Sequence, residues 1–341
     1  MPWIIAVLLL LAALVVYVLA SWPKLPPETD GIIKGVLYGE LPELVRGQTG
    51  YASSGGLRIW YESIRPEGSS KGAALLIMST AGSALDWPPA FVRALVDAGY
   101  QVIRYDHRGT GLSDRVENWD RKHPYTLADM AGDAVAVLDA LGLREVHVVG
   151  LSLGGMVAQE LAANFPGRVA SLTLMSTSGF IADPTLPALT SAYFISSLAK
   201  GLPLLKYRLM GGEANLIKER IAKTIVMVGR EGLDMRETAE VVVYQVRKRR
   251  GTNFKAIFQH LAAVNVSGSR YDKLPTLHIP TLVIHGTADQ LNPVEHGKKL
   301  VDVMPNAEGL WLKGVGHVFP YPHMDDINRR IVSHFESSRR Q

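Results

Sequence analysis

The fold is decided by the stretch Val148-Val149-Gly150-Leu151-Ser152-Leu153-Gly154-Gly155-Met156. An apolar run typical of a buried strand leads into it and helical periodicity follows, so the pattern G-x-S-x-G falls on a strand-to-helix turn. A serine on such a turn directs its hydroxyl out of the sheet edge. The strained backbone is tolerated only if the residues two before and two after lack bulk, a condition that Gly150 and Gly154 meet. We therefore expect Ser152 to be a nucleophile.

Two other interpretations of this motif exist. In a chain with 32 glycines a five-residue pattern can arise by chance. A glycine-rich turn between a strand and a helix can also bind a dinucleotide, but that function needs G-x-G-x-x-G. Ser152 stands where the middle glycine would be, and its side chain would block a pyrophosphate. We expect no cofactor.

Strands and helices alternate on both sides of the motif. Buried β-branched runs separated by amphipathic helices predict an α/β fold with a mostly parallel central sheet and helices on both faces. Before residue 180 the predicted strands are 57–61, 73–78, 101–105, 145–149 and 171–175, and the predicted helices are 90–98, 127–141 and 155–164. The Gly68-Ser69-Ser70 segment indicates a hairpin between the first two strands.

The alternation stops after about residue 180 and resumes at Pro280. The intervening sequence is mostly helix-like, which predicts a helical cap inserted over the carboxyl edge of the sheet, where open α/β sheets bind ligands. The resulting domain prediction is a core in two parts, 51–180 and 276–341, with the cap at 181–275. The second part carries predicted strands at 281–284 and 309–312 and predicted helices at 294–303 and 326–335.

The N-terminal residues are uncharged and almost wholly aliphatic from Trp3 to Ala20. At about 1.5 Å per residue this run can cross a hydrocarbon core of about 30 Å. A cleavable signal peptide is the alternative, because Val18 and Ala20 form a plausible cleavage site. The run is longer than usual for such a peptide, however, and no Lys or Arg precedes it.

We therefore predict a transmembrane anchor at 1–22 and a linker at 23–50, which would make the chain a single-pass membrane protein. The positive residues nearest the span, Lys24 and Lys34, lie on its C-terminal side and favour a cytoplasmic catalytic domain.

Composition excludes several other functions. A hydrophobic fraction of 47% is enough for a sizeable core. The excess of Lys+Arg 36 over Asp+Glu 32 is slight, so we expect no nucleic-acid partner. The chain has no cysteine, which excludes disulfides, thiol nucleophiles and thiolate metal sites.

With its serine on a strand-to-helix turn, the chain resembles the α/β-hydrolase superfamily of serine esterases and lipases over roughly residues 50 to 335. The family order is nucleophile, acid, histidine. The resemblance places the acid at Asp289, in the segment Leu282-Val283-Ile284-His285-Gly286-Thr287-Ala288-Asp289, and the histidine at His317, in Leu312-Lys313-Gly314-Val315-Gly316-His317. The other possible role of Asp289 is to cap a helix that begins near Pro293.

The remaining histidines fit the catalytic position less well. His147 and His285 lie on or at the end of predicted buried strands and read as core or supporting residues. His107 lies in Asp106-His107-Arg108-Gly109-Thr110-Gly111, which resembles a family loop that braces the site. The sequence indicates surface or tail positions for His323 and His334. None forms a cluster with metal-ligand spacing, so we expect no metal.

The resemblance also implies an oxyanion hole. One donor is the backbone amide of Leu153, next to the nucleophile, and the other comes from the loop after strand 73–78. The usual His-Gly there is replaced by Met78-Ser79-Thr80-Ala81-Gly82, so Thr80 is the aligned donor and Ser79 the alternative.

The implied reaction starts when His317 takes the proton of Ser152 as Ser152 attacks an acyl carbonyl. Asp289 holds the imidazole, and water then releases the acyl-enzyme. The same triad serves perhydrolases of the haloperoxidase type, thioesterases, acyltransferases and C–C hydrolases. A non-catalytic binding protein built on a hydrolase fold is the alternative from another class.

The expected substrate is a small-molecule carboxylic ester, and the predicted anchor favours a lipophilic or amphiphilic one. In the predicted cap, the apolar stretch from Ala192 to Leu205 could form an acyl-chain wall, and the basic cluster from Arg247 to Arg250 could contact anionic lipid headgroups. Packing inside the cap would explain the apolar stretch equally well, and an exposed helix end would explain the basic cluster equally well.

Overall fold

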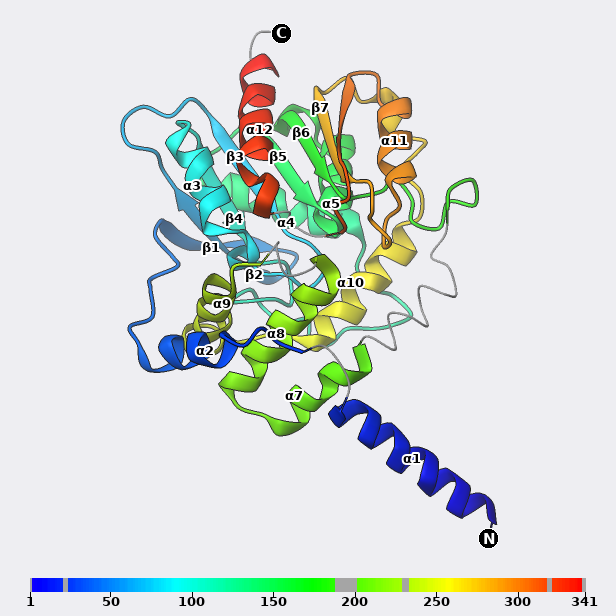
Figure 1. The fold of residues 1–341 in the computed structure, drawn as a ribbon. Coiled ribbons are helices and arrows are strands. Elements are labelled where there is room, and N and C mark those ends of the chain that lie inside the picture. Colours follow the sequence, from blue (N-terminus) through cyan, green and yellow to red (C-terminus); the bar gives the residue numbers. More distant parts are fainter. Residues whose placement is uncertain (1, 21–23, 188–200, 229–232, 318–320, 339–341) are drawn as a thin grey trace. The chain divides into compact units, whose positions relative to one another are not determined.

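A sheet forms the centre of the fold, with its strands in the order β1-β2-β4-β3-β5-β6-β7-β8. The computed structural model describes residues 2–20, 24–187, 201–228, 233–317 and 321–338 (Figure 1). The strands are β1 (Gln48–Ser54), β2 (Leu57–Ile64), β3 (Ala73–Ile77), β4 (Gln101–Tyr105), β5 (Val146–Leu151), β6 (Val169–Met175), β7 (Thr281–Gly286) and β8 (Ala307–Leu312). From β4 to β8 all neighbours are parallel, whereas β1, β2 and β4 pair antiparallel. The predicted mostly parallel sheet is confirmed.

The hairpin lies elsewhere than predicted. β2 and β3 do not pair, because β4 lies between them. The hairpin instead joins β1 to β2, and Gly55 and Gly56 form its tip with φ of 55° and 80°. Left-handed backbone at two successive residues suits glycine, which has no Cβ to clash.

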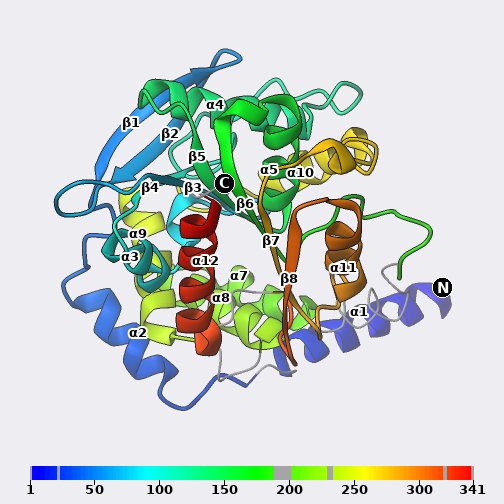
Figure 2. The ribbon, with the colours of Figure 1, turned by 90° about the horizontal axis from the view of Figure 1, so that it is seen from above.

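Helices cover both faces of the sheet (Figure 2). On one face lie α4 (Leu127–Ala140), α5 (Leu153–Asn164) and α11 (Val294–Val303), and on the other α3 (Pro89–Asp97) and α12 (Met324–Ser338). Along β3, Leu75 and Ile77 join the first face while Ala74 and Leu76 join the second, as the alternation of side chains on a strand requires. Both faces are therefore apolar.

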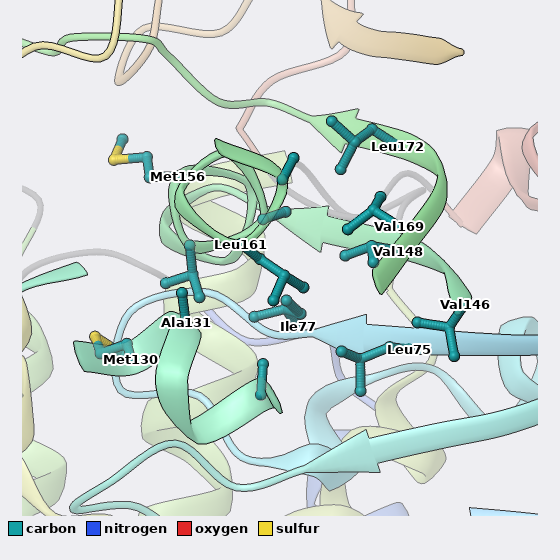
Figure 3. Packing of buried hydrophobic residues seen from close by; sticks show 14 of the residues in the cluster. Leu75, Ile77, Met130, Ala131, Val146, Val148, Met156, Leu161, Val169 and Leu172 are labelled. Atoms are coloured by element: carbon teal, nitrogen blue, oxygen red, sulfur yellow. The ribbon is translucent and has the colours of Figure 1, made fainter. Parts of the chain in front are cut away.

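The packing of the first face is visible from close by (Figure 3). Strands β3, β5 and β6 pack against α4 and α5 there. The strand residues shown are Leu75, Ile77, Val146, Val148, Val169 and Leu172, and the helix residues are Met130, Ala131, Met156 and Leu161. This packing holds α5 against β5, and Ser152 lies between these two elements.

The segment between β6 and β7 contains helices and no strand in the residues that are described. These helices are α7 (Leu205–Met210), α8 (Glu213–Val228), α9 (Met235–Lys248) and α10 (Phe254–Ser267). The helical content agrees with the sequence pattern, and a cap function for 181–275 stays a prediction. Most of the apolar stretch that begins at Ala192 lies outside the described residues.

The chain divides into a sheet unit, Glu43–Ala188 with Arg247–Gln341, and a helical unit, Met1–Pro42 with Leu189–Val246. In the helical unit, α2 (Thr29–Tyr38) buries Ile33 and Val36 against Ile217 and Ile221 of α8. The sequence predicted an irregular linker here, because the ten residues of α2 are too few to show sustained periodicity. A partner far along the chain stabilises this helix.

The predicted membrane anchor is wrong. Residues Pro2–Ala20 do form a helix, α1, of 19 residues. Within the described part of the chain, however, no helix has both the length and the apolar character needed to cross a membrane. A spanning helix needs about 20 apolar residues, and the apolar run from Trp3 to Ala20 falls just short of that length. The prediction of a single-pass membrane protein with a cytoplasmic catalytic domain is therefore wrong as well.

Candidate active site

Ser152 lies on the sharp turn between β5 and α5. Its backbone has φ 55° and ψ −116°, which is strained for any residue with a side chain. Two backbone hydrogen bonds hold the turn: Ser152 donates to the carbonyl of Met175 at 2.8 Å, and Gly155 donates to the carbonyl of Ser152 at 2.9 Å. The strain and these bonds fix the position of the serine.

The glycines of the motif are needed because the turn packs very closely. A Cβ on Gly150 would collide with the carbonyl of Gly154, and a Cβ on Gly154 would collide with the carbonyl of Ile77 at the end of β3. The turn therefore excludes any side chain at these two positions. The close contact also places the N-terminus of α5 beside the loop that follows β3.

The structure brings Ser152, His317 and Asp289 together in one hydrogen-bonded line. Ser152 Oγ lies 2.9 Å from His317 Nε2, and His317 Nδ1 lies 2.7 Å from Asp289 Oδ2. A carboxylate only accepts, so Nδ1–H donates to Asp289 and leaves Nε2 free to accept the serine O–H. Both the serine and the aspartate are buried.

Asp289 is held as a charged acceptor. Its Oδ1 accepts the amides of Leu291 and Asn292, both at 2.9 Å, and His285 Nε2 lies 3.3 Å from its Oδ2. Burial alone would raise the pKa of Asp289, but hydrogen bonds from His285 and His317 outweigh it and lower the pKa to about 2. The carboxylate is thus ionised at neutral pH. It does not cap α11, whose N-cap is Pro293 without a side-chain bond.

The loop after β6 supports the nucleophile through residues that the sequence did not single out. Thr177 Oγ1 donates to the carbonyl of Ser152 at 2.6 Å, and the side-chain Nδ2 of Asn292 donates to the carbonyl of Ser176 at 2.9 Å. The sequence did contain one signal for a role at the site. Ser176 and Thr177 are polar residues that directly follow a buried strand, at the carboxyl edge of the sheet where ligands bind.

The predicted oxyanion donors lie at the same edge. Leu153 is the first residue of α5, where backbone amides have no acceptor within the helix. In the loop after β3, the amide of Ala81 donates to His260 Nδ1 at 3.0 Å and the amide of Gly82 donates to the carbonyl of Ser79 at 3.0 Å. Over the residues described, no acceptor is found for the amide of Thr80. Ser79 stays an alternative.

The loop after β4 braces the other side of this region. His107 Nε2 donates to the carbonyl of Met78 at 2.7 Å, and burial lowers the pKa of His107 to about 4, so the ring is neutral. Asp106 accepts the amides of Ala84 and Leu112 at 2.9 and 2.8 Å. The loop thus contacts both ends of the segment that carries the candidate oxyanion donors.

Two charged or titratable residues lie deeper than the sequence indicated. Arg249 is buried and pairs with Asp106, so the basic cluster from Arg247 to Arg250 is not a continuous surface patch. His334, predicted at the surface, is buried with Nε2 3.0 Å from the carbonyl of Leu172. No group of three or more potential metal ligands gathers in the described residues.

Known proteins resemble this chain over most of its length. Residues 75–323 match the family described as alpha/beta hydrolase fold. Rhodomycin D methylesterase DauP from Streptomyces sp. (strain C5) is 31% identical over 294 residues, 81% of this chain and 94% of that protein. A 2-hydroxy-6-oxononadienedioate/2-hydroxy-6-oxononatrienedioate hydrolase from Pseudomonas sp. is 27% identical over 71% of this chain and 79% of that protein. The crystal structure of a hydrolase from Pseudomonas aeruginosa PA01 has a TM-score of 0.62 and 25% identity, covering 84% of this chain and 98% of that one. The chain belongs to the alpha/beta hydrolase fold family and is a hydrolase.

Proposed function

We propose that this hydrolase cleaves a carboxylic ester of a small molecule through an acyl-enzyme on Ser152. The observation that carries the proposal is the unbroken line from Ser152 Oγ through the His317 ring to Asp289 Oδ2, at 2.9 and 2.7 Å. An arrangement with nucleophile, base and ionised acid in hydrogen-bond contact is what acyl transfer requires. The similarity to a methylesterase supports an ester as the substrate class.

In this mechanism Ser152 Oγ attacks the acyl carbonyl carbon while its proton moves to His317 Nε2. Asp289, ionised because its pKa is about 2, stabilises the imidazolium that forms. His317 then gives the proton to the leaving alkoxide, and the alcohol departs. Water attacks the acyl-enzyme by the same proton route and releases the acid.

The developing oxyanion needs two donors. The amides of Leu153 and Thr80 are the candidates, because the first opens α5 and the second lies in the loop against which α5 packs. Preorganised amides act mainly on the transition state, where the negative charge is localised on oxygen.

Hydrolysis of a C–C bond is the second candidate. It is supported by the similarity to the Pseudomonas sp. relative, which is named as a hydrolase of 2-hydroxy-6-oxononadienedioate. Perhydrolase, thioesterase and acyltransferase activities use the same three residues, and the acceptor or the bond distinguishes them. Without a membrane anchor, a lipophilic ester loses the main feature that favoured it.

Labelling with a fluorophosphonate tests the nucleophile, and Ser152→Ala is the variant. The matched control is Ser63→Ala, which removes another buried serine hydroxyl, bonded to Gln101 and carried by β2, a strand that β4 and β3 separate from β5. We expect labelling in the wild type and the control, none in Ser152→Ala, and a fall in kcat of roughly 10⁶-fold on a reactive ester.

A substrate panel then separates the candidates. Methyl and longer esters, thioesters and a vinylogous 1,5-diketone acid are compared by kcat/KM at fixed enzyme concentration. Ester hydrolysis as the fastest reaction supports the proposal. A diketone cleaved much faster than every ester would favour the C–C reaction. Labelling that persists in Ser152→Ala would refute the role of Ser152 altogether, and a folded wild type that neither labels nor turns over would indicate a binding protein.

A further inference from the structure

His260 lies on α10 at the centre of a buried contact behind the loop that follows β3. We call Ser79–Gly82 the oxyanion loop. The side chain of His260 is fully buried, its Nδ1 accepts the amide of Ala81 at 3.0 Å, and its Nε2 lies 3.1 Å from the carbonyl of Arg108. Both ring nitrogens therefore have backbone partners, one in each of two loops that border the candidate site.

These partners define the state of the ring. A carbonyl can only accept, so Nε2 carries the hydrogen, and Nδ1 is the lone pair that receives the amide of Ala81. Burial lowers the pKa of His260 to about 3, which keeps the ring neutral and preserves that lone pair. The carbonyl of Arg108 is itself anchored, because the Arg108 guanidinium binds both carboxylate oxygens of Asp133 at 2.7 Å.

The oxyanion loop needs such an anchor. It is a tight turn closed by the bond from the amide of Gly82 to the carbonyl of Ser79. Ala81 occupies the third position of this turn with φ 54°, a conformation that favours glycine. Alanine is strained in this conformation, and the bond from its amide to His260 offsets part of that strain.

We propose that His260 is a positioning residue for the oxyanion hole, which fixes the Ala81 peptide and so aims the amide of Thr80 at the acyl oxygen. The bond to His260 occupies the amide of Ala81, whereas the amide of Thr80 stays available to donate to the acyl oxygen. This inference rests on the proposed acyl-transfer function. It assigns to α10, which carries none of the three triad residues, an effect on the chemical step through the oxyanion loop.

Two isosteric substitutions separate the two bonds of His260. In His260→Asn the amide oxygen takes the place of Nδ1 and still accepts from Ala81, but the donor to Arg108 is lost. In His260→Gln the terminal NH₂ takes the place of Nε2 and still donates to Arg108, but the acceptor for Ala81 is lost. The control is His147→Asn, which alters another buried histidine, bonded to Ser171 within the sheet core.

We expect His260→Gln to lower kcat by roughly 10- to 100-fold, less than the 10²–10³-fold loss of an oxyanion donor itself. KM should change by less than about twofold, because the contact with the oxyanion strengthens only in the transition state. His260→Asn and His147→Asn should keep kcat within roughly threefold of the wild type. This split between kcat and KM, and the rescue by Asn, would not follow from a general loss of stability.

A second measurement does not depend on the variants folding. Hydrogen exchange in the wild type reports whether the amide of Ala81 is protected, as a bond to His260 requires, and slow exchange is expected. Fast exchange at Ala81 would overturn the proposal, as would a His260→Gln variant with the kcat of the control or equal losses in the Gln and Asn variants. A wild type without Ser152-dependent ester hydrolysis would instead overturn the proposed function, and this role with it.

Discussion

Replacing Asp289 with asparagine tests how the site sets the tautomer of His317. Asparagine can keep the bonds to the amides of Leu291 and Asn292 through its oxygen, which turns its NH₂ toward His317 Nδ1. That donor favours the ring tautomer with hydrogen on Nε2, and this tautomer cannot accept the proton of Ser152. We expect kcat to fall about 10⁴-fold, which corresponds to about 5 kcal/mol of transition-state stabilisation.

The same substitution has a predicted effect on stability that depends on pH. The pKa of Asp289 is lowered from 3.8 to about 2 in the folded protein, and this difference is worth about 2 kcal/mol. Because the folded pKa is depressed, this stability is present above the unfolded value and is lost as the pH falls toward the folded value. The wild type should therefore lose about 2 kcal/mol of unfolding free energy between roughly pH 5 and pH 2 that Asp289→Asn does not lose.

Steady-state kinetics on an activated ester and urea unfolding at several pH values measure both effects. Asp302→Asn, an exposed position on α11, is the control for the loss of one carboxylate. A kcat within about tenfold of the wild type would contradict the tautomer argument. Equal pH slopes of stability in Asp289→Asn and wild type would contradict the low pKa.

Three further substitutions probe the support of the site. Thr177→Val removes the donor to the carbonyl of Ser152 and should lower the unfolding free energy by about 1–3 kcal/mol in urea titration, with a parallel fall in kcat. Gly154→Ala drives a methyl group into the β3 carbonyl and should cost about 1–3 kcal/mol or more, seen as a lower Tm; an unchanged Tm would mean that the turn can relax. Arg249→Met leaves the buried carboxylate of Asp106 without its cation and should cost about 3–5 kcal/mol at neutral pH, measured by chemical denaturation.

The sheet and the serine turn were predictable because their signals are local. The apolar run before Ser152, the two spaced glycines and the helix that follows lie within a short stretch, and the steric demand at Gly150 and Gly154 can be stated without a structure. His317 is 165 residues from Ser152. No local pattern connects them, so the sequence predicts their contact only through the order of residues in the family.

Other features depend on tertiary contacts that leave no local trace. His260 meets Ala81 across 179 residues, and nothing in the periodicity of α10 distinguishes it from an ordinary core histidine. Arg249 belongs to a run of four basic residues that resembles a solvated helix end, yet its partner Asp106 is 143 residues away. The anchor prediction failed for a different reason. An apolar run that falls just short of the length of a spanning helix does not by itself establish a membrane span.

The titratable groups around the nucleophile have protonation states that suit the proposed reaction. Asp289 is ionised because hydrogen bonds lower its pKa to about 2, whereas burial keeps His107 and His260 neutral by lowering their pKa values to about 4 and about 3. A protonated ring at His260 would have no lone pair for the amide of Ala81, and a neutral acid at Asp289 would not stabilise an imidazolium. Near neutral pH these three groups hold fixed protonation states, so the proton that moves in the proposed reaction is the one shared by Ser152 and His317.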